Sequence, residues 1–328
     1  MKVTIKDIAE QANVSTATVS KVLNKNDLSI SKATRERVLK VVKRNNYIPN
    51  AMAKGLKSRR SNMIGFILPD ITNPFFPELA RGIEDKAKEY NFGVVFCNTD
   101  DDPDREGECF RFLGSQMIDG IIFASSQEES SYDNALLRSV PVVMVDRGVT
   151  IADGNVGKVS IDSRSASAAA TQLLVGSGCR RVAYISAKCN TANQRYLGYL
   201  GALEKSGIKV DESLIYLGEY DVETGLRGTQ WLLEQGSFDG IVCGNDLIAA
   251  GAMTVLGRNG LSVPGDVKVI GFDNIYLSQH LNPPLTTVEQ PTYEIGRTAA
   301  EMLLENIVNG VPLYSRKLDY RIIMRQTV

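Results

Sequence analysis

The chain has 328 residues, of which 43% are hydrophobic and 23% are charged, a composition typical of a soluble globular protein of two to three domains. No apolar run approaches the roughly 18 residues that a membrane helix requires, and the first residues lack the apolar stretch of a secretory signal. The five cysteines are scattered without C-x-x-C spacing. They indicate reduced thiols in a cytoplasmic protein rather than a disulfide or zinc framework.

Charge divides the chain into a basic head and an acidic body. Residues 1–60 contain 9 Lys and 5 Arg against 2 Asp and 2 Glu, a net charge of +10. The whole chain has 37 basic and 38 acidic residues, so residues 61–328 contain 23 and 34, a net charge of −11. Because each Lys or Arg placed on a phosphate releases condensed counterions, the head predicts a polyanionic partner. The body must serve another purpose.

The first part of the basic head is expected to form two short helices. Thr4 fits a helix cap, and apolar residues then recur at helical spacing until Ala12. A short break at Asn13 follows, and Ser15 can cap a second helix that runs through Leu23. Two short helices joined by a tight turn are typical of a helix-turn-helix, whose second helix enters the major groove of DNA.

A third helix is expected to close the core of this head. Ser31 caps it, it ends at about Asn46, and Val38, Leu39 and Val42 are expected to face inward. The alternative is an ordinary three-helix bundle with a solvated face. The tight turn occurs together with a large excess of positive charge, and this combination favours a domain that binds double-stranded DNA.

Residues 49–61 are expected to form a short hinge helix and a linker. Asn50 is a good helix cap, but a helix of about eight residues is not stable alone. Gly55 weakens it by roughly a further 1 kcal/mol relative to Ala. We therefore expect the segment to become ordered only when a partner supplies contacts. Leu56 is then available to wedge into a base step of the minor groove; the alternative is a flexible linker.

The acidic body alternates apolar runs with helical stretches. The expected strands are residues 64–68, 94–98, 120–124, 142–145, 182–186, 215–218, 241–244 and 268–272, with a last strand at 318–325. The helices expected between them include residues 76–90, 165–176 and 246–259. This alternation favours an α/β fold with parallel sheets covered on both faces, in which ligands bind beyond the carboxyl ends of the strands.

Polar and aromatic side chains gather at these expected strand ends, where a ligand would bind. Carboxylates, amides and a guanidinium can pair with hydroxyl groups, and aromatic rings can cover the apolar face of a sugar. The mixture therefore suits a neutral polyol or monosaccharide. The candidate effector-binding residues are Asn73, Phe75, Phe76, Asp146, Arg147, Arg195, Tyr220, Asn245, Asp273 and Gln290.

Each candidate has a structural alternative. Asp146 and Asp273 also fit turn or cap positions, and Arg195 also fits a surface ion pair. The Asn245-Asp246 pair can cap the helix that follows it. Of the two adjacent phenylalanines, one is expected in the apolar core and the other in the ligand cleft.

Several stretches resemble the lactose-repressor (LacI/GalR) family of bacterial transcription regulators, in the family's order and over essentially the full chain. In the head and hinge they are TIKDIAEQANVSTATVSKVLN, ATRERV and YIPNAMAKGL. In the body they are ITNPFFPELARGIED, MIDGIIF, VPVVMVDR, VCGNDLIAAGAM, VPGDVKVIGFDN and PPLTTVEQP.

The resemblance implies a helix-turn-helix domain over residues 1–48, a hinge helix, and an effector-binding and dimerisation domain over residues 62–328. This second domain would be of the periplasmic-binding-protein-like type I, with two α/β parallel-sheet subdomains. Subdomain N would comprise about residues 62–161 and 291–318, and subdomain C about residues 162–290 and 319–328.

The resemblance also implies which residues contact DNA. Base edges would be read by Thr16, Ala17 and Lys21, through one hydroxyl, contact with a thymine methyl, and donation to guanine. Phosphates would be contacted by Thr4, Ser15, Thr18, Ser20 and Asn24, and the minor groove by the hinge residues Asn50, Ala53 and Leu56. We expect a homodimer on a near-palindromic operator, because protein two-fold symmetry is then matched by the DNA. No apolar heptad tail follows the last expected strand, so no tetramerising extension is expected.

No motif supports an enzyme. His280 is the only histidine, and it lies in a loop-like stretch without metal-ligand spacing. The chain has no G-x-x-x-x-G-K-[ST] motif, and the Gly176-Ser177-Gly178 fragment follows a helix, the reverse of the dinucleotide-binding order. We expect no catalytic residue, metal or cofactor.

The sequence is interpreted as that of a repressor of carbohydrate-utilisation genes that a sugar releases from DNA. The alternatives are a secreted binding protein, a global carbon-catabolite-type regulator with a phosphoprotein corepressor, and a purine- or nucleoside-responsive repressor.

Overall fold

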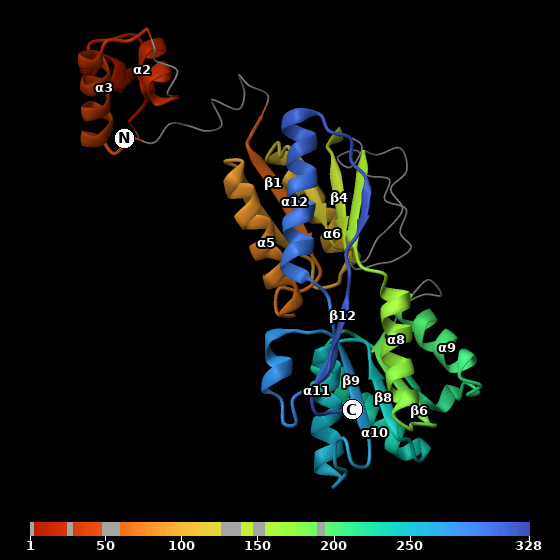
Figure 1. Ribbon diagram of the computed structural model, residues 1–328. Helices are drawn as coiled ribbons and strands as arrows, with labels where there is room; N and C mark the ends of the chain where they lie inside the picture. Colours follow the sequence, from red (N-terminus) through yellow and green to blue (C-terminus); the bar gives the residue numbers. More distant parts are fainter. Residues whose placement is uncertain (1–2, 25–28, 48–59, 126–138, 147–154, 189–193) are drawn as a thin grey trace. The chain divides into compact units, whose positions relative to one another are not determined.

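The chain forms two compact units that divide between Ser61 and Asn62 (Figure 1). The computed structural model describes residues 3–24, 29–47, 60–125, 139–146, 155–188 and 194–328. The first unit is helical, and the second contains two β-sheets with helices on their faces. This confirms the expected α/β fold class with an N-terminal helix-turn-helix.

The three helices of the first unit begin at the expected caps. The helices are α1 (Ile5–Gln11), α2 (Thr16–Leu23) and α3 (Lys32–Arg44). Thr4 and Asp7 form a reciprocal capping box at the start of α1, and the side chains of Ser15 and Ser31 accept backbone N–H groups of α2 and α3. Between α1 and α2, Asn13 adopts a left-handed conformation with φ 51°, which makes the turn tight.

The small core of this unit corrects one expectation. Ile8, Val19 and Val38 are fully buried in it, and Val42 packs against them. Leu39 was expected to face inward but is 46% exposed. The reason is geometric, because Leu39 follows Val38 by about 100° around α3, which turns its side chain away from the core that Val38 enters.

The first sheet of the second unit, called the N-sheet here, has six strands in the order β11-β5-β4-β3-β1-β2, all parallel. Its strands are β1 (Met63–Leu68), β2 (Gly93–Asn98), β3 (Gly120–Phe123), β4 (Val142–Val145), β5 (Val156–Ser160) and β11 (Ser315–Lys317). The helices that accompany it are α5 (Phe75–Glu89), α6 (Pro103–Ser115) and α12 (Thr292–Asn309). The strand order reverses between β1 and β3, which is where ligands bind in such sheets.

The second sheet, called the C-sheet here, repeats this plan with the order β12-β10-β9-β8-β6-β7. Its strands are β6 (Val182–Ala187), β7 (Ile215–Gly218), β8 (Gly240–Cys243), β9 (Lys268–Asp273), β10 (Thr286–Glu289) and β12 (Arg321–Ile323). Its helices are α8 (Ser163–Gly176), α9 (Gln194–Lys205), α10 (Val222–Gln235) and α11 (Asp246–Arg258), with 3₁₀ turns at Glu212–Leu214 and Tyr276–His280. Only β12 runs antiparallel, against β10. The chain therefore passes between the sheets after β5, after β10 and after β11.

Alternating strand residues bury the two faces of each sheet separately. On β1, Phe66 faces the cluster that contains α5 and α12, whereas the next residue, Ile67, faces the cluster that contains Phe110 of α6. On β6, Tyr184 packs with Tyr199 of α9 on one face. Because both faces are covered, the strands are almost continuously apolar, which is why most of them were predicted within a residue or two.

The expected strands omitted β5, β10 and β11. Their sequences, VGKVS, TTVE and SRK, contain too few apolar residues to be recognised as strands. In β10, Thr286 and Thr287 are nonetheless fully buried, because neighbouring elements cover them. The last strand is shorter than the expected residues 318–325, since only residues 321–323 pair with β10. Packing therefore defines these strands.

Helices pack unusually closely where glycines face each other. In the pair α10 and α11, a Cβ on Gly251 would lie 2.2 Å from the carbonyl oxygen of Val222, and a Cβ on Gly225 would lie 2.1 Å from the carbonyl oxygen of Ile248. The two helix backbones are therefore in direct contact. Any larger side chain must push them apart, since backbone atoms cannot rotate away as a side chain can.

Candidate functional site

The exposed face of α2 carries the residues expected to read DNA. The helix buries Val19 and Val22 and leaves Thr16, Ala17 and Lys21 exposed. Ala17 lies four positions before Lys21, so these two side chains are neighbours on one face of the helix, and Thr16 lies about 100° around the helix from Ala17. A face with two small side chains and one cation allows close approach of the helix backbone to a base edge.

Several residues expected to contact phosphates also stabilise the ends of α2. Ser15 Oγ accepts the backbone N–H of Thr18 at 3.1 Å and lies 2.9 Å from Thr18 Oγ1. Asn24 Nδ2 donates to the carbonyl oxygen of Ser20 at 2.8 Å. These contacts fix the ends of the helix. The hinge candidates Asn50, Ala53 and Leu56 lie outside the described residues.

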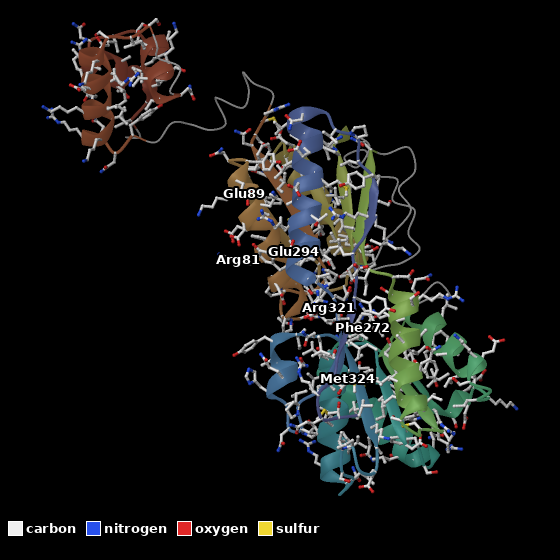
Figure 2. The ribbon with its side chains drawn as sticks, viewed as in Figure 1. Arg81, Glu89, Phe272, Glu294, Arg321 and Met324 are labelled. Atoms are coloured by element: carbon white, nitrogen blue, oxygen red, sulfur yellow. The ribbon has the colours of Figure 1, made fainter. Side chains whose placement is uncertain are left out.

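In the second unit, Arg195 is the centre of a group of charged and aromatic side chains from both sheets. Its Nη1 donates to the carbonyl oxygen of Gly244 at 2.6 Å. Its Nη2 lies 3.5 Å from an oxygen of Asp146, which follows β4 of the N-sheet, and 3.5 Å from an oxygen of Asp273, which ends β9 of the C-sheet. The guanidinium carbon lies 4.0 Å from the centre of the Phe272 ring. Figure 2 labels Phe272 in the region where the two sheets meet.

Burial and charge act in opposite directions on Arg195. The residue is only 8% exposed. Burial alone lowers the pKa of its guanidinium, but electrostatic interactions with Tyr220, Asp273 and Asp146 outweigh this effect and raise the pKa. Arg195 therefore keeps its positive charge inside the protein. The alternative of a surface ion pair is wrong, because the guanidinium is buried between two carboxylates from different sheets.

Both aspartates of this group have a positive φ angle, a backbone conformation that residues other than glycine rarely adopt. Asp146 has φ 56° and Asp273 has φ 104°. Gln290 Nε2 donates to Asp273 Oδ1 at 2.8 Å, which directs the carboxylate. Strained residues of this kind persist where the surrounding structure holds them, and they concentrate at functional sites.

Asn245 and Tyr220 connect the group to helix α11. Asn245 Oδ1 accepts the backbone N–H of Ile248 at 2.9 Å and so caps α11, as its structural alternative predicted. Its Nδ2 donates to the carbonyl oxygen of Tyr220 at 3.2 Å. The Tyr220 ring centre lies 5.4 Å from the Arg195 guanidinium. Asn245 therefore fixes the position of the aromatic residue next to the arginine.

Three further candidates lie at the start of α5, a helix that packs on the N-sheet. Asn73 is 5% exposed, and its Oδ1 accepts the backbone N–H of Phe75 at 3.1 Å, which leads the chain into the helix. Phe75 and Phe76 are both buried, with ring centres 5.2 Å apart. The expectation that only one of them is in the core is wrong, because this first turn lies within the largest apolar cluster and both directions meet apolar neighbours. Arg147 lies outside the described residues.

Sequence reasoning missed four residues of this group. Phe272 and Gly244 contact Arg195 directly. Asp246, expected as a possible cap, instead accepts a hydrogen bond from the side chain of Thr287. The position of Phe272 directly before Asp273 was a usable signal, whereas a carbonyl contact and a buried threonine leave no trace in the sequence.

Within the described ranges, no group of three or more His, Cys, Asp or Glu side chains is arranged to hold a metal ion. Within the same ranges, no helix is both long enough and apolar enough to cross a membrane.

Two family models together match almost the whole chain. Residues 4–50 match the model described as bacterial regulatory proteins of the lacI family. Residues 61–319 match the model described as periplasmic binding proteins and sugar binding domain of the LacI family. These matches cover the three helices of the first unit and every strand of the two sheets except β12.

Similar proteins match this chain over more than nine tenths of their length. The transcriptional regulator RegA of Clostridium saccharobutylicum is 40% identical over 313 residues, covering 93% of this chain and 92% of RegA. A ribose operon repressor of Halalkalibacterium halodurans is 35% identical over 328 residues, covering 99% of this chain and 96% of the relative. A crystal structure of the Lac repressor dimer, bound to operator and an anti-inducer, superposes with a TM-score of 0.86 at 25% identity, covering 100% of this chain and 99% of the repressor.

Proposed function

Because the chain belongs to the LacI family of bacterial regulatory proteins, we propose that it is a homodimeric repressor that a small neutral sugar releases from its operator. It acts in the cytoplasm on a near-palindromic operator near carbohydrate-utilisation genes, and it catalyses no reaction. The relatives named as regulators and as a ribose operon repressor support this proposal.

The observation that carries the sugar assignment is the placement of Arg195 between two carboxylates. Both ion-pair distances are 3.5 Å. A strong charge-assisted hydrogen bond is shorter, about 2.7–2.9 Å. A sugar hydroxyl that accepts from Arg195 and donates to Asp146 or Asp273 therefore replaces a weak contact by two short ones. The Phe272 ring beside the guanidinium supplies an apolar surface.

The charge of this group favours a neutral ligand. One guanidinium and two carboxylates leave a net charge of −1 in a largely buried region. A phosphate brought to the same place would be repelled by two carboxylates and attracted by one guanidinium, so the net charge of the group opposes it. A free sugar is therefore favoured over a sugar phosphate.

The proposed mechanism is a shift between two conformations. Three chain segments connect the N-sheet to the C-sheet, so we propose that the two sheets change their angle as units. Such a change moves the start of β1, which follows the hinge in the sequence. A sugar that contacts Asp146 of the N-sheet and Asp273 of the C-sheet favours one angle. The operator favours the conformation in which the paired hinges fit the minor groove. Each ligand then weakens binding of the other.

A thermal-shift screen of the full-length protein tests the sugar assignment. D-Ribose is measured first, followed by hexoses, disaccharides, polyols, sugar phosphates, nucleosides and purines. A ligand at 100 times its Kd stabilises the native state by about 2.7 kcal/mol, which is readily measured as a higher melting temperature. We expect a neutral sugar to raise the melting temperature of the wild type but not of Asp273→Asn. Stabilisation by a nucleoside or by a phosphorylated compound alone would contradict the proposal.

A further inference from the structure

The turn after β9 contains two consecutive residues in the left-handed region. Asp273 has φ 104° and Asn274 has φ 56°, and neither is a glycine. Residues other than glycine rarely adopt this backbone conformation, and two such residues in succession persist only where several contacts hold them. This turn also carries the carboxylate that faces Arg195 and Gln290. What holds the turn therefore determines the position of Asp273.

Asp246, the first residue of α11, is bonded to the chain directly after this turn. Its Oδ2 accepts the backbone N–H of Ile275 at 2.8 Å, and its Oδ1 accepts the hydroxyl of Thr287 at 2.5 Å. Thr287 belongs to β10, so the carboxylate of Asp246 connects the start of α11, the turn after β9 and strand β10. Asp246 is 1% exposed. The Asp246 carboxylate is therefore held by contacts with other protein groups rather than by solvent.

Gly271 makes room for this arrangement. A Cβ at Gly271 would lie 2.1 Å from Asp246 Oδ1. The carboxylate therefore lies directly against the backbone of β9, two residues before Asp273. Burial, and after it the charge of Asp273, raise the pKa of Asp246.

A second set of contacts holds the side chain of Asn274. Its Nδ2 donates to Glu289 Oε1 at 3.1 Å, and its Oδ1 accepts from Arg325 Nη2 at 2.7 Å and from Ser278 Oγ at 3.2 Å. These contacts hold the middle of the turn, and Asp246 holds its end. Among the described contacts, the bond to Asp246 is the one that restrains the backbone N–H of Ile275 directly.

We propose that Asp246 is a positioning residue of the effector site, which holds the backbone of residues 273–275 so that the Asp273 carboxylate faces Arg195. The proposal rests on the proposed sugar-binding function. Thr287 is its partner, because the hydroxyl fixes the carboxylate in the orientation that accepts from Ile275. Asp246 acts through Asp273 rather than on the sugar itself, since its two oxygens already accept hydrogen bonds inside the protein.

Two threonine variants give a matched test that preserves shape and volume. Thr287→Val removes the hydroxyl that bonds Asp246. Thr229→Val removes a hydroxyl in α10 that is also fully buried but has no hydrogen-bond partner within the described part of the chain. Hydrogen exchange, followed by mass spectrometry on full-length protein without sugar, reports on peptides that cover residues 272–278. We expect exchange there to become on the order of 10-fold faster in Thr287→Val and to remain unchanged in Thr229→Val.

Sugar binding then separates a positioning role from a merely structural one. The probe is D-ribose, measured by calorimetry. We expect its Kd to rise on the order of 10-fold in Thr287→Val and in Asp246→Ala, and to recover in Asp246→Asn, whose amide can still accept from Ile275 and donate to Thr287. Should Asp246→Ala not fold, Thr287→Val and Asp246→Asn still provide the comparison.

The outcomes are distinguishable. Unchanged exchange at residues 272–278 in Thr287→Val overturns the positioning role, and so does faster exchange with an unchanged Kd for D-ribose. If D-ribose does not bind the wild type, the proposed function fails for that sugar. The exchange rates alone then decide whether Asp246 and Thr287 hold the turn.

Discussion

Replacing Gly251 by alanine tests whether the contact between α10 and α11 is as close as the structure shows. The new Cβ would lie 2.2 Å from the carbonyl oxygen of Val222, 2.8 Å from the backbone nitrogen of Leu226 and 2.9 Å from the Cα of Gly225. Ordinary van der Waals contact begins at 3.4 Å, so the shortfall against Val222 is 3.4 − 2.2 = 1.2 Å. All three neighbours are backbone atoms, so the two helices must separate.

The expected magnitude follows from two opposing effects. Overpacking of a tight interior costs about 1–3 kcal/mol, and a backbone contact belongs at the upper end of that range. Alanine in a helix gains roughly 1 kcal/mol over glycine. The net effect of Gly251→Ala is then about 2 kcal/mol of destabilisation. At roughly 2–4 °C per kcal/mol, the melting temperature should fall by about 4–8 °C.

Gly257 provides a control in the same helix. A Cβ at this position meets no atom within 4 Å, and the residue is exposed. Gly257→Ala therefore keeps only the helix-propensity gain and should be as stable as the wild type or up to about 1 kcal/mol more stable. Both variants are compared by circular dichroism during heating. If Gly251→Ala melts at or above the temperature of Gly257→Ala, the close packing of these helices is wrong.

Three further predictions concern binding and pH. Leu56→Ala should weaken operator binding strongly in a fluorescence anisotropy assay while leaving the Kd for sugar almost unchanged; equal losses would exclude separate sites. Arg195→Ala should abolish the melting-temperature rise with D-ribose but preserve operator binding. The hydrogen bond from Tyr90 to the Glu305 carboxylate, and then burial, raise the pKa of Tyr90 to about 12. Because the protonated phenol is favoured in the folded state, this stabilisation is present below pH 10 and is lost between about pH 10 and 12. Tyr90→Phe should therefore lose less stability than the wild type over that interval in urea titrations.

The helix caps show what could be predicted from the sequence. A hydroxyl directly before a helical run determines where the helix begins through local hydrogen bonds alone, so Thr4, Ser15 and Ser31 were identified correctly. Leu39 was predicted wrongly, because a leucine next to a buried valine looks equally apolar whichever way it faces. Its exposure is a consequence of which helices pack against α3.

The site shows the same division. Asp146, Arg195 and Asp273 could be chosen as candidates because polar residues at the ends of apolar strands are visible in the sequence. Their separation of about 3.5 Å, and the burial of Arg195, required the arrangement of two sheets. The carboxylate of Asp246 was ambiguous, because a cap and a buried partner of a distant threonine have the same local sequence. Only the pairing of β9 with β10 brings Thr287 to it.

The two sheets contribute unequally to this site, and the inequality has a consequence for regulation. The C-sheet and its helices supply Arg195, Asp273 and Gln290, with contacts of 2.6 Å from Arg195 to Gly244, 2.8 Å from Gln290 to Asp273 and 3.5 Å from Arg195 to Asp273. The N-sheet supplies Asp146, whose contact to Arg195 is 3.5 Å. A ligand shifts an equilibrium only by the difference in its affinity for the two conformations. In the proposed mechanism, binding to the C-sheet groups supplies affinity, while the hydroxyl that bridges to Asp146 supplies the coupling. In the proposed mechanism, Asp146→Asn should consequently reduce the response of operator binding to sugar more than it reduces sugar affinity, and equal reductions would contradict this assignment.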